Sequence, residues 1–283
     1  MLTSHAEVFT PKTLHDALDL RAAHPEAKAL AGGTDLMVSI ELGSTAPEEV
    51  INLWGVKALR GVEAVDGALK IGALTTYTEL IRSPLVQQGA PSLVEVSRTV
   101  GAVQIQNRGT LGGNIAGASP AGDTLPVLLA LDAEIEVASA ARGPRRIPMA
   151  ALYTGYRDLA MEVDELITAV WLPARHPEDH THFRKVGTRL AQAISKVMFG
   201  GRVRVDASGV ITEARIAFGS VAPTPVRCPT VEAALVGKAP DPAAADLLRH
   251  DIAPIDDVRS TADYRLAVAT RTLRAWLQHL SDA

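Results

Sequence analysis

The stretch QIQNRGTLGGNIAGASPAGD, residues 104–123, decides how the fold of this chain is interpreted. Its glycines permit close backbone contact, and its hydroxyl, amide and carboxyl groups offer hydrogen bonds. The stretch is too irregular for a strand or a helix, and long irregular segments in compact domains are usually functional or disordered. Because its flanks are apolar and regular, we favour function, with Asp123 accepting from ribose hydroxyls. A tightly packed corner of buried turns is the structural alternative.

A second glycine-rich turn, AGGTDL at residues 31–36, lies between a predicted strand and a predicted helix. Such a turn lets unpaired N–H groups point at a ligand, and the helix dipole favours an anion such as phosphate. An ordinary strand-to-helix turn that needs a positive φ explains the same residues. Neither glycine-rich segment has the Walker pattern or the Gly-x-Gly-x-x-Gly pattern, so a nucleotide would be held by another arrangement.

The rest of the sequence predicts mixed helix and sheet. The first seventy residues read as a small α/β unit, and a second α/β region follows it up to Pro173. The polar segment 175–180 is the best linker candidate. After it come a hairpin over 203–219, with its turn near Ser208 and Gly209, and then helices from Val231 onward. Before the linker, the predicted strands cover residues 7–9, 27–31, 49–53, 69–73, 133–137 and 166–172. The predicted helices in the same part of the chain begin near Thr13, Thr34, Thr75, Pro126 and Met149.

Composition excludes several classes of protein. The formal net charge is −4 without a basic block, and only 4% of residues are aromatic, so we expect neither a nucleic-acid partner nor a membrane surface. The longest apolar stretch, near residues 125–131, is too short to span a bilayer, and no signal peptide is visible at the N-terminus. The single cysteine, Cys228, excludes an internal disulfide or a cysteine-ligated metal cluster.

Three histidines in the linker do not predict a metal site. His176, His180 and His182 lack acidic or cysteine partners at suitable spacing, so a solvated polar loop is the better interpretation. We identify no catalytic acid–base pair and no hydrolase nucleophile.

Taken together, six motifs make the sequence recognisable. In this order they resemble the FAD-binding medium subunit of molybdenum hydroxylases, the xanthine dehydrogenase and aerobic carbon monoxide dehydrogenase family, over nearly the whole chain. The motifs are AGGTDL (31–36), QIQNRGTLGGN (104–114), ASPAGD (118–123), FRKVGTR (183–189), ISKV (194–197) and GSVAPTPVR (219–227).

The resemblance implies an α+β fold in two domains. Residues 1–176 would form a FAD-binding domain of the vanillyl-alcohol-oxidase (PCMH) type, with subdomains at about 1–57 and 58–176. Residues 177–283 would form a smaller α+β domain with a three-stranded antiparallel sheet and helices.

The resemblance also implies a set of FAD-binding residues. The 31–36 backbone would contact the pyrophosphate, the 113–123 segment would line the ribityl and flavin-proximal side, and Ile167 would make an apolar contact. Gly117 stands where some relatives have threonine, and no aromatic residue in 188–192 is available to stack on the ring. The predicted residues are Ala31, Gly32, Gly33, Thr34, Asp35, Leu36, Thr110, Gly112, Gly113, Asn114, Gly117, Ser119, Asp123, Ile167 and Lys185.

Lys185 has two interpretations. By the resemblance it lies near the flavin edge, where a cation would favour the reduced anionic form and raise the reduction potential. The alternative is a surface lysine beside Arg184 in a basic strand.

The implied function is electron transfer by an oxidoreductase subunit. A large partner would oxidise substrate at a molybdenum cofactor, a small partner would carry [2Fe–2S] clusters, and FAD on this chain would pass electrons to an external acceptor. We expect a cytoplasmic dimer of heterotrimers. The alternatives are a stand-alone FAD-dependent oxidase or dehydrogenase of the same fold and a non-catalytic nucleotide-binding module.

Overall fold

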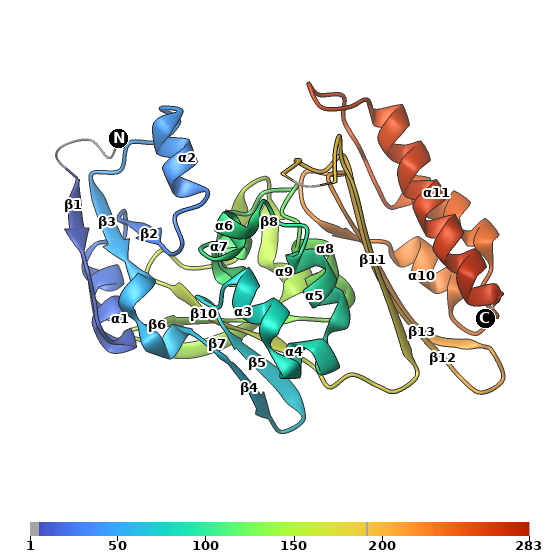
Figure 1. Ribbon diagram of the computed structural model, residues 1–283, viewed down its shortest axis with the longest axis horizontal. Helices are drawn as coiled ribbons and strands as arrows, with labels where there is room; N and C mark the ends of the chain where they lie inside the picture. The colour runs from blue at the N-terminus through green and yellow to red at the C-terminus, as the bar shows by residue number, and fades with distance from the viewer. Residues whose placement is uncertain (1–5, 191, 283) are drawn as a thin grey trace.

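The computed structural model describes residues 6–190 and 192–282, and it shows an elongated molecule with three main sheets along its long axis (Figure 1). Residues 1–5, which begin the segment inspected for a signal peptide, lie outside this description, as does Ala191 in the 188–192 segment. No helix in the described ranges combines the length and the apolar character that crossing a membrane requires.

The N-terminal unit is a small parallel sheet. Helix α1 (Leu14–Ala23) connects its first two strands in sequence, and α2 (Leu36–Glu41) follows the second. The helix start predicted near Thr13 is confirmed and forms a capping box, because Thr13 Oγ1 accepts from the Asp16 N–H at 3.1 Å and the Asp16 carboxylate accepts from the Thr13 N–H at 3.2 Å. In spatial order the strands are β1 (Glu7–Phe9), β3 (Glu49–Asn52) and β2 (Lys28–Leu30).

The central unit is a five-stranded antiparallel sheet covered by short helices. Its middle strand, β10, reads LITAVWL, a nearly continuous apolar run of the kind found where both faces of a strand are covered. In spatial order the strands are β4 (Val62–Val65), β5 (Ala68–Gly72), β10 (Leu166–Leu172), β6 (Glu134–Ser139) and β7 (Gly143–Pro148). The helices and minor elements are η1 (Leu53–Gly55), η2 (Lys57–Leu59), α3 (Tyr77–Arg82), α4 (Pro84–Gly89), α5 (Pro91–Ser97), α6 (Val103–Gln106), α7 (Leu111–Ala116), α8 (Leu125–Ala130), α9 (Met149–Leu152), β8 (Tyr153–Gly155) and β9 (Asp158–Leu159).

The C-terminal unit is an antiparallel sheet backed by helices. Its three long strands agree with the predicted three-stranded sheet, and a two-residue strand extends it at one edge. The predicted turn is confirmed at Ser208 and Gly209, where the Asp206 carboxylate accepts from the Ser208 N–H at 2.8 Å and Gly209 has a φ of 82°. In spatial order the strands are β11 (Asp179–Val186), β12 (Val197–Val205), β13 (Ile211–Gly219) and β14 (Val226–Arg227); the helices are α10 (Pro229–Leu235), η3 (Pro242–His250) and α11 (Ala262–Ser281).

Helix α8 joins the central and C-terminal units. All six of its residues are buried, and it lies against both β12 and β13. Gly200 of β12 allows this approach, because a Cβ there would lie 2.7 Å from the Pro126 carbonyl oxygen. Phe183 of β11 and Ala217 of β13 belong to the same hydrophobic core as the central helices. These contacts join the two units, while the C-terminal sheet and its own helices enclose a second, separate hydrophobic core.

Ion pairs reinforce this junction. The Asp132 carboxylate, just after α8, accepts from three arginines of the C-terminal sheet: Arg202, Arg215 at 2.8 Å and Arg227 at 3.2 Å. Asp132 has a φ of 51°, a conformation that aspartate tolerates better than most residues. One carboxylate thus contacts three strands at once.

Some predictions from sequence were wrong. The 101–124 segment is not irregular throughout, because it contains the short helices α6 and α7. The linker ends earlier than expected, since Asp179 and His180 already belong to β11. His182 is only partly solvated, because its ring stacks on Trp276 with centroids 6.0 Å apart. Strand β11 starts well before the basic strand expected around Arg184 and Lys185, since its first polar residues resemble a loop.

We expect Gly200→Ala to lower the free energy of unfolding by about 1–3 kcal/mol, because the new methyl group would force α8 away from β12. Gly55→Ala is the matched control, since the nearest atom to a Cβ there is 3.7 Å away. Urea unfolding of both variants and the unaltered chain measures the difference. Equal stability of the two variants would show that α8 is not held against Gly200.

Candidate functional site

The two glycine-rich segments meet in space. Gly32 lies directly against the backbone of the second segment, so that a Cβ on Gly32 would be 1.7 Å from the Arg108 carbonyl oxygen. On the other side of the contact, a Cβ on Gly113 would lie 3.8 Å from the Ala31 side chain. Segments 31–36 and 104–123 therefore lie against each other between the N-terminal and central units.

The fold itself requires glycine at both positions of the first turn, Gly32 and Gly33. Gly33 has a φ of 80°, which the turn from β2 into α2 requires and which glycine adopts without strain. Gly32 is needed for the close contact with Arg108. The rest of the turn is open: Thr34 and Leu36 are half-buried and Asp35 is exposed. The structural explanation accounts for the glycines, and the open backbone around them is what remains for a ligand.

Two of the predicted site residues face the protein interior. Thr110 is buried and begins α7, where its Oγ1 accepts from the Gly113 N–H at 3.1 Å. Gly112 lies against β5, since its N–H donates to the Ala73 carbonyl at 2.8 Å and a Cβ there would lie 2.7 Å from the same oxygen. These two residues hold α7 in place.

The following turn is held by its own side chains. The Asn114 side-chain oxygen accepts from the Thr124 hydroxyl at 2.6 Å, and the Ser119 hydroxyl accepts from the Ala121 N–H at 3.3 Å. Gly117 ends α7, its N–H donating to the Gly113 carbonyl at 3.0 Å. The turn from Gly117 to Asp123 is thereby fixed beside Gly113.

An ion pair lies at the end of this segment. Lys185 Nζ is 2.6 Å from Asp123 Oδ2 and donates to the Thr99 carbonyl at 3.1 Å. The two side chains are only 10% and 12% exposed, so Lys185 is not the surface lysine that the alternative interpretation described. The lysine comes from β11, and Asp123 and Thr99 come from the central unit. The pair therefore ties the C-terminal sheet to the glycine-rich segment.

The charges of this pair perturb its neighbourhood. Burial raises the pKa of Asp123, and the Lys185 ammonium opposes that rise. Burial, with the Asp123 charge in addition, also raises the pKa of the enclosed Tyr77 phenol. Among the described residues no hydrogen bond reaches Asp123 Oδ1, which leaves one carboxylate oxygen as an acceptor.

Ile167 is a core residue. It is 8% exposed on β10, next to an irregularity in the pairing with β6 between Ile167 and Ala169. Helix α7 lies against β10, so Ile167 belongs to the interior behind the glycine-rich segment.

Sequence reasoning missed three contributors to this site: the Arg108 carbonyl, the Thr99 carbonyl and Tyr77. Backbone carbonyls leave no signal in a residue pattern. Tyr77 left only a weak signal in the sequence, the glycine at position 109. A glycine is required there because a Cβ at Gly109 would lie 2.9 Å from the Tyr77 ring. Elsewhere Cys228 is fully buried, as expected of a small packed side chain, and within residues 6–190 and 192–282 no cluster of three or more His, Cys, Asp or Glu is placed to hold a metal ion.

Two family models match most of the chain. The family model described as the FAD binding domain in molybdopterin dehydrogenase matches residues 4–175, and that of the CO dehydrogenase flavoprotein C-terminal domain matches residues 182–280. The chain belongs to the FAD-binding medium subunits of molybdenum hydroxylases. As a member of this family of oxidoreductases it contains a FAD-binding domain followed by the flavoprotein C-terminal domain.

Individual relatives extend the comparison to the whole flavoprotein chain. The xanthine dehydrogenase FAD-binding subunit of Escherichia coli O157:H7 is 34% identical over 90% of this chain and 88% of its own length. A solved carbon monoxide dehydrogenase from Hydrogenophaga pseudoflava is 30% identical, covers 97% of this chain and 96% of the matched chain, and has a TM-score of 0.92. Reconstituted CO dehydrogenase from Oligotropha carboxidovorans is 27% identical, covers 100% of this chain and 99% of the matched chain, and has a TM-score of 0.93.

We expect Gly32→Ala in this flavoprotein to weaken FAD binding about tenfold or more, equivalent to about 1.4 kcal/mol, because the methyl group would push segment 31–36 away from Arg108. FAD titration of the purified variant measures the loss. Gly155→Ala is the control, since the nearest atom to a Cβ there is 3.8 Å away. Unchanged FAD affinity in Gly32→Ala would show that the contact between the segments does not shape the cofactor site.

We expect Lys185→Met to destabilise the chain by about 3–5 kcal/mol, because it leaves the Asp123 carboxylate buried without its cation. The folded-state pKa of Asp123 would rise further above its usual 3.8. A carboxyl whose pKa is raised on folding adds stability below its unfolded pKa and loses that stability as pH rises through the folded pKa. The deficit should therefore be smallest near pH 3.8 and grow toward neutral pH.

Urea unfolding at a series of pH values checks this prediction. The double variant Lys185→Met/Asp123→Leu removes both charges and is expected to recover much of the stability without the pH dependence. A deficit of equal size at every pH would contradict the role given to the pair.

Proposed function

We propose that this chain is the electron-transfer flavoprotein of a molybdenum hydroxylase complex. FAD would lie where segments 31–36 and 104–123 meet. It would take electrons from [2Fe–2S] clusters of a small partner subunit, which in turn receive them from a molybdenum cofactor on a large partner. The observation that carries the proposal is the forced contact of Gly32 with the Arg108 carbonyl, since it brings both predicted cofactor segments into one site.

The residues at this site fit FAD. The open backbone from Ala31 to Leu36 suits the pyrophosphate, and the free acceptor of Asp123 suits a ribose or ribityl hydroxyl. Gly113 has no side chain to hold segment 104–123 away from the cofactor. Asn114, Gly117 and Ser119 shape the turn that follows it. We propose that Thr110, Gly112 and Ile167 act from behind, as supports of α7 and β10.

Lys185 has a different role from that of a free cation. Its ammonium is paired with Asp123, so the pair would present little net charge to a flavin nearby, and we propose that it positions the 117–123 turn. When bound, FAD supplies the two-electron chemistry that joins the clusters to an external acceptor. The chain's own part is to hold the cofactor, fix its surroundings and leave a path for electrons.

The composition supports the proposal that other subunits hold the iron–sulfur clusters. The chain has a single cysteine, and it is buried, so clusters ligated by cysteine must be held elsewhere. The relatives reported above are named for xanthine and for carbon monoxide, which fits a substrate pocket on another subunit. We propose a FAD-binding domain at 1–176, with subdomains at about 1–57 and 58–176, a C-terminal domain at 177–283, a dimer of heterotrimers and a cytoplasmic location.

Flavin reduction tests the proposal. The purified chain is expected to bind one FAD, and a pre-reduced small subunit is expected to bleach the visible absorbance of that flavin in a rapid-mixing experiment. The control is the same mixture with chain stripped of FAD. Absence of FAD binding would overturn the cofactor assignment, and failure of the reduced small subunit to bleach bound flavin would overturn the electron-transfer role. Turnover of an organic substrate by the isolated chain would instead establish a stand-alone oxidase or dehydrogenase.

A further inference from the structure

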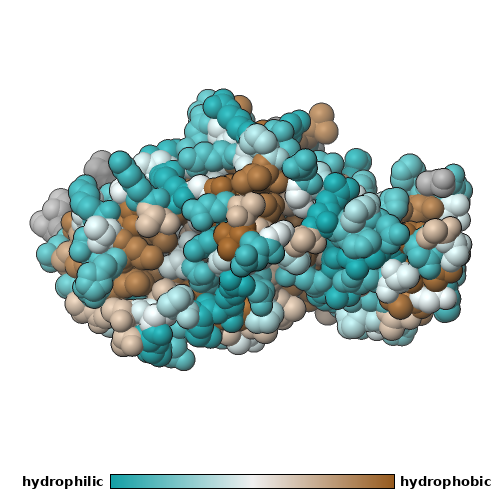
Figure 2. Space-filling view, turned by 90° about the horizontal axis from the view of Figure 1, so that it is seen from below, coloured by the Kyte–Doolittle hydropathy of each residue, from teal (hydrophilic) through white to brown (hydrophobic). Residues whose placement is uncertain are grey.

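A groove of about 810 Å³ lies along the outer part of β11. Helix α5 forms one wall with Pro91 and Glu95, and α11 forms the other with Arg271 and His279. The outer part of β11, from Asp179 to Arg184, lies between them. Seen from below, the surface between the larger and the smaller lobe is predominantly hydrophilic (Figure 2).

The strand in this groove has a free edge. In the described chain β11 pairs only with β12. The Val186 carbonyl accepts from the Lys196 N–H and the Glu178 carbonyl from the Val205 N–H, so even-numbered residues of β11 direct their backbone groups toward β12. By alternation, Thr181 and Phe183 direct theirs outward. Such an edge is a template for another strand.

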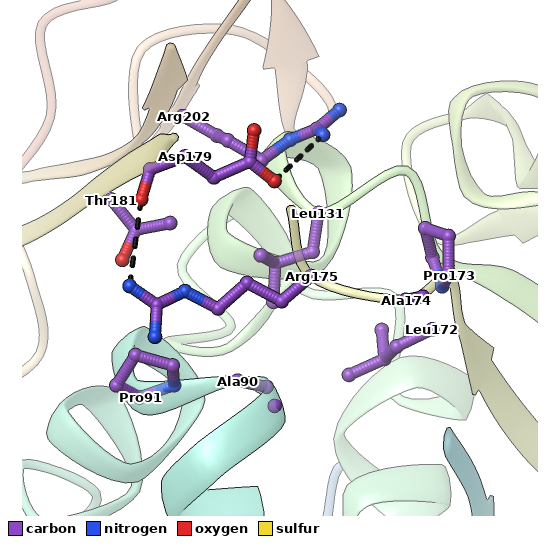
Figure 3. A pocket seen from close by; sticks show the side chains of 11 residues that line it. Ala90, Pro91, Leu131, Leu172, Pro173, Ala174, Arg175, Asp179, Thr181 and Arg202 are labelled. Carbon is purple, nitrogen blue, oxygen red and sulfur yellow. Dashed lines mark hydrogen bonds and ion pairs between the residues drawn. The ribbon is translucent and has the colours of Figure 1, made fainter. Parts of the chain in front are cut away.

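The start of the edge is already capped. Arg175 reaches back along the chain, and one of its terminal nitrogens donates to the Asp179 carbonyl at 3.5 Å, while the Asp179 carboxylate lies 3.6 Å from Arg202 (Figure 3). The Asp179 N–H donates to the His176 carbonyl. The open edge therefore begins at Thr181.

The groove carries uncompensated positive charge. Over the described residues, Arg184 and Arg271 make no ion pair or hydrogen bond, whereas Arg202 and Arg204 of the neighbouring strand are both ion-paired. Of the two carboxylates lining the groove, Asp179 is committed to those paired arginines. The other is Glu95 of α5, whose pKa is raised by burial, with the Arg98 charge opposing that rise. Among the described groove residues, the two unpaired arginines therefore outnumber this one carboxylate.

His182 contributes less charge than the arginines. Burial, with Arg184 and His279 nearby, lowers the pKa of His182, which favours the neutral form of its ring. His182, His180 and Arg184 occupy alternate positions of β11 and so share one face of the strand. The charge that an occupant would meet comes mainly from Arg184 and Arg271.

We infer that the groove receives an extended acidic segment of a partner subunit, added to β11 as a further strand. Main-chain bonds to Thr181 and Phe183 would hold it, and Asp or Glu side chains at alternate positions would lie beside His180, His182 and Arg184. The free edge argues for an extended chain, and the arginines argue for carboxylates. A nucleic acid fits less well, because the whole chain has a net charge of −4. The inference rests on the proposed function, which supplies the partner subunits.

Amide hydrogen exchange and assembly measurements test it together. The FAD-loaded chain is compared alone and in complex with the large and small subunits. We expect slower exchange at Thr181 and Phe183 on assembly. We also expect Arg184→Glu and Arg271→Glu each to raise the dissociation constant about tenfold, with the loss reduced at high salt. Arg249→Glu, an exposed charge reversal in η3 outside the groove, is the matched control and should assemble normally.

The outcomes separate this inference from the proposed function. If the unaltered chain assembles but exchange in β11 is unchanged, the groove is not the docking site and the inference falls while the proposed function stands. Protection of β11 by anionic phospholipid vesicles or by RNA, without protection on assembly, would also overturn it. If the unaltered chain does not assemble at all, both fall. The FAD content of each variant shows whether it has folded. If a charge reversal prevents folding, the exchange measurement on the unaltered chain still decides the inference.

Discussion

The contact between the Gly32 backbone and the Arg108 carbonyl is the constraint on which the site depends. A methyl group at Gly32 has no room, and both backbone segments are held by the elements beside them: residue 32 lies two residues after β2, and residue 108 lies between α6 and α7. The contact therefore fixes the N-terminal parallel sheet against the central antiparallel sheet. Everything proposed to touch FAD is arranged around this one point of closest approach.

The Lys185–Asp123 pair plays the corresponding role between the central and C-terminal units. A buried pair is an expensive way to stabilise a protein, since the desolvation of both groups offsets much of their attraction. Its value is specificity of position, because the lysine also binds the Thr99 carbonyl and so joins β11 to two separate loops of the central unit. Together with the arginines around Asp132, it makes the position of the C-terminal sheet dependent on charge geometry as well as on packing.

Much of the fold followed from the sequence because its signals are local. The capping box at Thr13, the turn at Ser208 and Gly209 and the apolar run of β10 each report their own structure. The site was predicted in its segments but not in its contacts. Gly32 looked like a ligand-binding glycine, and its neighbour proved to be a carbonyl from a distant segment, which no residue pattern encodes. Lys185 could not be placed because its burial depends on Asp123 and Thr99, far away in the chain. The first residues of strand β11 were assigned to the linker because residues 179–182 are all polar and show no alternation of apolar and polar side chains.

Helix α8 has a consequence for how the chain can be divided. It lies before the C-terminal unit in sequence, yet its six buried residues complete the interior on which β12 and β13 rest. A fragment that starts at the linker would expose the bare glycine surface of those strands, and a fragment that stops there would expose α8. The boundary visible along the sequence thus cuts through a packed contact, and each piece alone would expose apolar surface that the other covers in the whole chain.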